Sequence, residues 1–293
     1  MADELNRVFL WGIPRSLTTV FIKCLSYVDG IQIATQLYAD AFYFGPDAKR
    51  PVTTPHHPMG PKLNALLDGI YKSKVAASGV DPSLMSLESI RRILEAPYPG
   101  KKVFLCKDQA QYLDGRYDML PKGFKYSFII RHPNKVFPSY KKHVLGAQIA
   151  DDMRTWPPIV LPPGRCYKEL CDLVEYVREN IEPSPVILDA DDLLQDPAGI
   201  LSTYCSKMGI PYSSKLLSWK PGRDITSTWV GTKICMSVDE KDPAYRNVFE
   251  SEGFIRPSPI PDLDSLPDDV QACVRYSIGY YEDLHRQRIV ASR

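Results

Sequence analysis

The fold is decided by residues 8–19, Val-Phe-Leu-Trp-Gly-Ile-Pro-Arg-Ser-Leu-Thr-Thr. The first four residues are apolar and are closed by Gly12 and Pro14, a pattern typical of a buried strand that ends in a loop. From Thr18 through Val28 the apolar residues recur at helical spacing. This stretch therefore predicts a strand, a glycine-containing loop and a helix.

The same alternation continues along the chain. Apolar runs predict further strands at 31–34, 103–106, 126–130 and 186–188. Helices are expected at 63–75, 84–94, 133–145, 165–180, 196–208 and 268–286, whereas 38–61 and 211–261 show no regular period. Strands that alternate with helices predict an α/β protein with a central, mainly parallel sheet flanked by helices in three layers. With no repeat or linker, residues 1–293 are expected to form a single domain.

Three of the predicted strands end at a cation. Arg15 follows the first strand, Lys107 the third and Arg131 the fourth. In open parallel sheets, ligands bind outside the carboxyl ends of the strands. The sequence therefore predicts a pocket there for an anion with several charges.

The loop after the first strand has the features of a phosphate site. Backbone N–H groups at the start of the helix would point at a phosphate, and Ser16, Thr18 and Thr19 add hydroxyl donors. The nucleotide triphosphatase loop, G-x-x-x-x-G-K-[ST], fits at Gly12 and Thr19 only. Leu17 stands where that loop has its second glycine and Thr18 where it has lysine, so an ATPase of that type is excluded.

A second segment, 131–143, reads Arg-His-Pro-Asn-Lys-Val-Phe-Pro-Ser-Tyr-Lys-Lys-His. Arg131 leaves a strand, Pro133 suits the first turn of a helix, and Ser139 lies about two turns into that helix. An arginine fork and a serine hydroxyl placed in this way suit a phosphate group.

Both segments resemble motifs of one enzyme superfamily. Residues 14–19 resemble the 5′-phosphosulfate loop of sulfotransferases, and residues 131–143 resemble their 3′-phosphate motif, with the same spacing from arginine to serine. Segments 37–45, 189–197 and 208–212 are similar to a divergent sulfotransferase-like branch, sometimes labelled branched-chain aminotransferase-like. The resemblance implies a phosphate-loop fold and 3′-phosphoadenosine 5′-phosphosulfate (PAPS) as donor. It assigns the 5′ side of PAPS to Arg15, Ser16, Leu17, Thr18 and Thr19, and its 3′ phosphate to Arg131 and Ser139.

The activity implied is in-line transfer of a sulfuryl group from PAPS to a hydroxyl or amine, with PAP as the product. Arg15 or Lys107 would stabilise the charge on the leaving oxygen, and no metal is required. The acceptor would enter under 38–61 and the stretch after Pro211. Because these segments are aromatic, a small, partly apolar molecule is favoured as acceptor.

The sequence departs from the family at two points that concern the nucleotide. Val20 stands where cytosolic sulfotransferases carry the tryptophan that stacks on adenine, so adenine must be held otherwise. The family's C-terminal Arg-Lys-Gly segment is absent, and Arg223 or Arg256 could replace it.

A third departure concerns the general base. The family's Lys-Thr-His motif reads Lys107-Asp108-Gln109 here, so the histidine is missing. Asp108 is the candidate base, and burial would have to raise its pKa against the effect of Lys107. His56, His57 and His143 are alternatives. A salt bridge or a helix cap is the structural alternative for Asp108.

Two other functions stay open at this point. One is a magnesium-dependent nucleotide phosphotransferase, against which Leu17 and Thr18 count. The other is a binding or regulatory protein that keeps the nucleotide pocket without catalysis, which the missing histidine allows.

Composition restricts the partners and the compartment. The chain has 36 basic and 35 acidic residues among 293, a net charge of +1, which argues against a nucleic-acid or membrane-coating protein. Its seven cysteines are scattered without a CxxC pair, which favours a reducing compartment. No leader or membrane-span pattern is present, so a cytoplasmic protein is expected. No sequence feature specifies an oligomeric state.

Overall fold

The computed structural model describes residues 5–46, 82–146, 150–231 and 243–291, with a few isolated positions between 48 and 72. Its strands are β1 (Asn6–Gly12), β2 (Ile31–Thr35), β3 (Val103–Gln109), β4 (Phe124–Ile130) and β5 (Val186–Asp189). The α-helices of the described residues are α1 (Thr18–Leu25), α2 (Leu37–Phe44), α4 (Leu87–Glu95), α5 (Pro133–Gly146), α6 (Tyr167–Asn180), α7 (Ala190–Gln195), α8 (Pro197–Met208), α10 (Pro243–Glu250) and α11 (Asp268–Arg286). Two short 3₁₀ helices matter for the site, η3 (Ala110–Leu113) and η5 (Met153–Thr155).

The five strands form one sheet in the order β2-β3-β1-β4-β5, and every neighbouring pair is parallel. The register pairs Gly12 at the end of β1 with Gln109 of β3 and with Ile129 of β4. The carboxyl ends of these three strands therefore lie side by side at one edge of the sheet. The predicted parallel sheet is confirmed.

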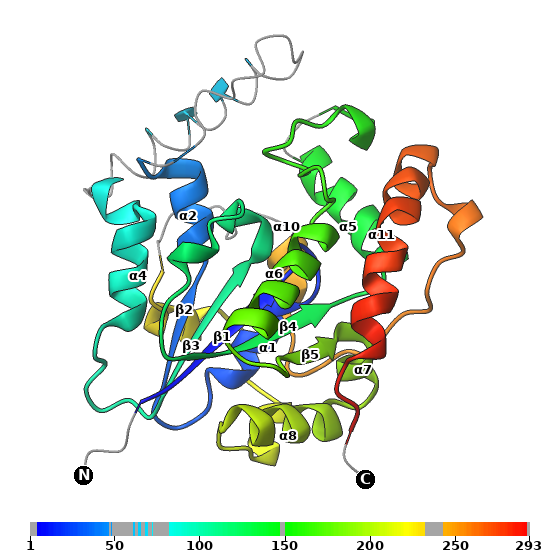
Figure 1. Cartoon of the computed structure of the whole chain (residues 1–293). Helices are drawn as coiled ribbons and strands as arrows, with labels where there is room; N and C mark the ends of the chain where they lie inside the picture. Colours follow the sequence, from blue (N-terminus) through cyan, green and yellow to red (C-terminus); the bar gives the residue numbers. More distant parts are fainter. Residues whose placement is uncertain are drawn as a thin grey trace.

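Helices cover both faces of the sheet (Figure 1). Phe9, Phe104 and Phe128 face a core that is closed by α2, α4, α5, α6 and α11. The intervening residues, such as Leu10 and Leu105, face a second core with α1 and α8. Side chains alternate between the two faces because a strand has a period of two residues. The predicted three-layer α/β architecture is confirmed.

Two stretches without a regular period contain helices that the sequence did not predict. Helix α2 lies at the start of 38–61, and all of its residues except Asp40 are apolar or aromatic. A helix with no polar face produces no amphipathic period, so its sequence looks irregular. Within 211–261, α10 begins at Pro243, a residue that suits the first turn of a helix.

Strand β3 extends further than its apolar run. Lys107 and Asp108 were expected to follow the strand, but both pair with β1 inside it. The helix expected at 63–75 falls largely outside the described residues. Within the described part of the chain, no helix is long and apolar enough to cross a membrane.

Candidate active site

The loop between β1 and α1 is tightly folded. A Cβ atom at Gly12 would lie 2.7 Å from Cγ2 of Thr18 and 3.0 Å from Cγ2 of Ile129, so any larger residue there would force the Thr18 side chain to shift. Ser16 is fully buried, and its hydroxyl donates to the carbonyl of Ile13 at 2.7 Å. Thr18 is nearly buried and opens α1, whose first-turn N–H groups point out of the helix. The loop thus presents backbone donors at a helix N-terminus, as an oxyanion requires.

Leu17, which precedes α1, has a left-handed backbone with φ of 65°. This conformation costs a residue with a Cβ atom about 1–2 kcal/mol and costs glycine nothing. We therefore expect the free energy of unfolding of Leu17→Gly, measured by urea denaturation, to be about 1 kcal/mol higher than that of Leu17→Ala. At an ordinary helical position the order would be reversed. Equal stability of the two variants, or a more stable alanine variant, would contradict a left-handed backbone conformation at Leu17.

The two motifs predicted to bind phosphates meet in the structure. Nε of Arg15 donates to Oγ of Ser139 on α5 at 3.0 Å. Nη1 of Arg131, at the end of β4, donates to the carbonyl of Arg15 at 3.1 Å. The hydroxyl of Tyr167 donates to the carbonyl of Arg131 at 2.6 Å and fixes the backbone there. The structure thus brings Arg15, Arg131 and Ser139 together.

A half-buried acid that the sequence analysis missed lies beside Arg131. Oδ1 of Asp191, on α7, is 2.9 Å from Nζ of Lys135 and 3.7 Å from Nε of Arg131. Burial lowers the pKa of Arg131, and the Asp191 carboxylate opposes that shift. Asp191 follows β5, so the reasoning that placed three cations at strand ends would have placed this acid at the same edge.

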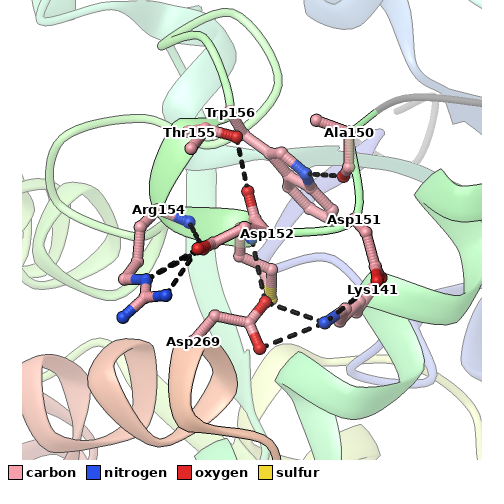
Figure 2. Close-up of polar contacts among 9 residues, drawn as sticks. Lys141, Ala150, Asp151, Asp152, Arg154, Thr155, Trp156 and Asp269 are labelled. Carbon is pink, nitrogen blue, oxygen red and sulfur yellow. Dashed lines mark hydrogen bonds and ion pairs between the residues drawn. The ribbon is translucent and has the colours of Figure 1, made fainter.

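Helix α5, which carries Ser139, is fastened to the end of α11 that begins at Asp268. Both carboxylate oxygens of Asp269 accept from Nζ of Lys141, at 3.0 and 2.9 Å, and one accepts from the N–H of Met153 at 2.9 Å (Figure 2). Lys141 also pairs with Asp151 at 3.5 Å. Lys141 is therefore mostly buried rather than part of a solvated face, and its ion pairs orient the helix that holds Ser139.

Asp269→Ala is expected to lower the free energy of unfolding by about 2–3 kcal/mol, because it leaves the Lys141 ammonium without its buried partner. Burial alone would raise the pKa of Asp269, yet the Met153 amide and Lys141 hold it below its usual value. This stabilisation is therefore present above about pH 4 and is lost as the pH falls further. The neighbouring Asp268 is exposed. Urea denaturation of Asp268→Ala is the control. An equal loss of unfolding free energy in the two variants would contradict a stabilising ion pair between Asp269 and Lys141.

Lys107 and Asp108 are both buried and point to opposite faces of β3. Lys107 is 2% exposed and faces the side of Leu105, which α1 covers. Asp108 is fully buried and faces α2. Its Oδ2 accepts from the N–H of Tyr38 at 2.7 Å, and its Oδ1 accepts from the N–H of Gln109 at 2.9 Å. The Asp108 carboxylate thus caps the first turn of α2, the structural alternative named for it.

Burial also raises the pKa of Asp108 to about 6, although Lys107 and the backbone donors of Gln109, Tyr38 and Ala39 oppose the rise. The sequence analysis expected burial to raise the pKa of Asp108 and Lys107 to lower it, and both effects are present. A carboxyl group with this pKa is suited to take up a proton near neutral pH. Of the other candidate bases, His143 lies on α5, and His56 and His57 lie outside the described residues.

The aromatic residues expected to line the acceptor entrance fall into two groups. Tyr38 is fully buried, and its hydroxyl donates to the carbonyl of Met119, so this residue belongs to the core. Phe42 and Tyr43 are half-buried, and their rings lie 5.3 and 5.5 Å from the ring of Tyr112 on η3. These three residues form an aromatic cluster beside the carboxyl end of β3.

The segment after Pro211 is held on α1 by a buried lysine. Nζ of Lys23 donates to the carbonyl of Val248 in α10 at 2.9 Å, and burial lowers its pKa. The guanidinium of Arg223 lies 4.0 Å from the ring centre of Phe249, whereas Arg256 is exposed. Among the described residues, no three His, Cys, Asp or Glu side chains gather as metal ligands would.

The chain is similar to known sulfotransferase proteins. Residues 182–285 match the sulfotransferase domain family, a region that runs from β5 to α11 and excludes both phosphate motifs. Among solved structures, the sulfotransferase domain of the Synechococcus PCC 7002 olefin synthase is 16% identical, with a TM-score of 0.46, and covers 93% of this chain and 94% of that one.

Two curated proteins of Arabidopsis thaliana are also similar. Branched-chain-amino-acid aminotransferase-like proteins 2 and 1 are 25% and 27% identical to this chain, over 73% and 66% of it. The chain spans about a third of the length of each, since 32% of either relative is covered. The resemblance predicted from the two loops is confirmed in that residues 182–285 match the sulfotransferase domain family and the chain is similar to these branched-chain-amino-acid aminotransferase-like proteins.

Proposed function

We propose that this protein is a PAPS-dependent sulfotransferase that acts on a hydroxyl or amine of a small, partly apolar acceptor. The observation that carries the proposal is the meeting of the two motifs. Arg15 contacts Ser139 at 3.0 Å, and Arg131 contacts the Arg15 carbonyl at 3.1 Å. Residues 116 to 124 positions apart thereby form one cationic site at a helix N-terminus, which suits a nucleotide with phosphates at both its 5′ and 3′ positions.

The residues at this site fit such a donor. Nε of Arg131 is buried and has no hydrogen-bond acceptor among the described residues. A phosphate oxygen would satisfy this N–H group, and the 3′ phosphate is the one that Arg131 and Ser139 would hold. The 5′ side would be bound by Arg15, Ser16, Leu17, Thr18 and Thr19, through backbone N–H groups and the hydroxyls of Thr18 and Thr19, because the Ser16 hydroxyl already donates to the carbonyl of Ile13.

PAPS, when bound, supplies an activated sulfuryl group. A bond forms between the acceptor oxygen or nitrogen and sulfur, while the bond from sulfur to the bridging oxygen of the nucleotide breaks. The electron pair stays on that bridging oxygen, so negative charge develops there. Arg15 and Lys107 would stabilise this charge at the carboxyl ends of the strands.

The acceptor loses a proton in the same reaction, and we assign it to Asp108. Burial raises the pKa of this carboxylate to about 6, even though the backbone N–H groups of Gln109, Tyr38 and Ala39 all donate to it. Asp108 faces α2 and the aromatic cluster, the side on which the acceptor would enter. Lys107 and Asp108 would thus serve the donor and the acceptor from opposite faces of β3.

The test of this function is a transfer assay with purified protein. The protein is incubated with PAPS and a panel of phenols, alcohols and amines, and PAP release and sulfated products are measured by mass spectrometry. Sulfation of at least one acceptor is expected, with no need for magnesium. Phosphorylated products formed only from ATP and magnesium would indicate a phosphotransferase. PAP binding without transfer to any acceptor would indicate a binding protein.

A further inference from the structure

The acid beside Arg131 has no role in the reaction described so far. Oδ1 of Asp191 lies 2.9 Å from Nζ of Lys135 and 3.7 Å from Nε of Arg131. The side chains of Lys135, Arg131 and Asp191 are only 5%, 16% and 18% exposed, so the three charges lie mostly out of water. Asp191 therefore cancels one of the two positive charges that the segment after β4 brings to the nucleotide site.

Asp191 does not orient the Arg131 side chain. A separation of 3.7 Å is longer than a hydrogen bond, and neither carboxylate oxygen of Asp191 accepts a hydrogen bond among the described residues. The guanidinium of Arg131 is fixed instead by its own hydrogen bond to the carbonyl of Arg15, at 3.1 Å. The carboxylate therefore acts on Arg131 through its charge and not by holding its geometry.

The backbone of Asp191 is held in place by bonds that do not involve its carboxylate. Asp189 ends β5 and pairs with Ile130, the last residue of β4. Oδ1 of Asp189 accepts from the N–H of Asp191 at 2.7 Å, and Oδ2 of Asp189 accepts from the hydroxyl of Tyr281 at 3.0 Å. A change confined to the Asp191 carboxylate leaves these bonds intact, so its charge can be removed while the start of α7 stays in place.

A carboxylate at this position opposes a bound phosphate. The 3′ phosphate assigned to Arg131 would share one guanidinium with Asp191, and two anions this close repel each other. Asp191 also pairs with Lys135, whose ammonium would otherwise be available to attract the phosphate. PAPS and PAP carry the same 3′ phosphate, so both effects weaken the binding of donor and product alike. Weaker product binding matters because slow product release limits many enzymes.

We propose that Asp191 is an opposing charge that weakens the binding of the 3′ phosphate and thereby speeds the release of PAP. The inference rests on the proposed function, because it requires the 3′ phosphate to lie at Arg131. Lys135 balances Asp191 and keeps the net charge of the site positive, so that the nucleotide still binds. The pair thus sets the affinity for PAP without contact with the reacting atoms.

The test is surface plasmon resonance of the immobilised protein with PAP and with AMP, which gives the affinity and both rate constants. Asp191→Asn should bind PAP about tenfold more tightly, mainly through slower dissociation. Its affinity for AMP, which has no 3′ phosphate, should not change. Asp192→Asn is the matched control, since it removes the same charge from the next residue, whose carboxylate pairs with Arg288 at 2.6 Å. The control should bind PAP as the wild type does.

Two further variants keep the test valid if one unbalanced charge impairs folding. Lys135→Gln leaves Asp191 without its partner and should weaken PAP binding about tenfold. The double variant Lys135→Gln/Asp191→Asn removes both charges and leaves no unpaired ion, so its fold should be kept. Because the net charge beside Arg131 is then the same as in the wild type, its PAP affinity should stay within about threefold of the wild-type value.

A loss of PAP affinity in all three variants would make Asp191 a positioning residue and would overturn the inference. An unchanged affinity in Asp191→Asn, or a gain that comes from faster association alone, would also overturn it. Failure of the wild type to bind PAP is a different result, because it would overturn the proposed function itself.

Discussion

Arg131→Ala is expected to lower the affinity for PAP about 100-fold, the largest loss that a single change at the nucleotide site should cause. The guanidinium would donate to the 3′ phosphate through charge-assisted hydrogen bonds, each of which contributes about 1.5–3 kcal/mol. Its Nε is buried and makes no hydrogen bond among the described residues, and it lies 3.7 Å from Oδ1 of Asp191, so a phosphate oxygen would supply the hydrogen bond that this ion pair is too long to provide. Calorimetric titration of both proteins with PAP measures the difference.

Two controls separate the loss of a phosphate contact from damage to the loop. AMP lacks the 3′ phosphate, so its affinity should change little in Arg131→Ala, although Arg131 also contacts the Arg15 carbonyl. Arg92→Ala removes an arginine whose side chain is 71% exposed, and it should bind PAP as the wild type does. A parallel loss of PAP and AMP affinity would mean that Arg131 supports the loop only.

Asp108→Asn is expected to lower turnover about 100-fold or more, because the amide cannot take the acceptor proton. Folding should be largely kept, since the asparagine oxygen can still accept from the N–H of Tyr38. In the wild type, kcat/KM should rise with pH to a plateau above about pH 6, the pKa to which burial raises Asp108. Asp114→Asn, at an exposed position after η3, is the control.

The same carboxyl group has a predicted effect on stability. Its folded-state pKa of about 6 is above the ordinary value of 3.8, so between these values the folded protein holds a proton that the unfolded chain has released. Its contribution is therefore full below about pH 4 and is lost as the pH rises to about 6. Relative to Asp108→Asn, the wild type should lose about 3 kcal/mol of unfolding free energy over that interval.

Two results would contradict these roles for Asp108. Turnover that survives in Asp108→Asn, with its pH profile unchanged, would leave Asp108 as the cap of α2 alone. A stability difference between the two proteins that stays constant from pH 4 to pH 6 would mean that burial does not raise the pKa of this carboxyl. The kinetic and the denaturation measurements test the two roles independently.

Much of the fold follows from local pattern. The strand at Val8–Trp11 and the helix after Thr18 could be predicted because a buried parallel strand is a continuous apolar run and a glycine loop ends it. The meeting of Arg15 with Arg131 was also predictable. Neighbouring parallel strands end at the same edge, so residues that follow them converge.

Other features depend on long-range contacts that no local pattern encodes. Helix α2 escaped prediction because it is apolar on all sides, and its first turn is capped by Asp108, some 70 residues away. The ion pairs of Asp191 required the position of α7 beside α5.

The most direct test of the central claim is calorimetric titration of the wild-type protein with PAP, beside AMP and beside ATP with magnesium. The two motifs that meet at Arg15 predict that PAP binds without a metal and far more tightly than AMP, because Arg131 and Ser139 would hold the 3′ phosphate under the proposed function. Binding of PAP no tighter than AMP, or binding of ATP with magnesium alone, would contradict a PAPS site.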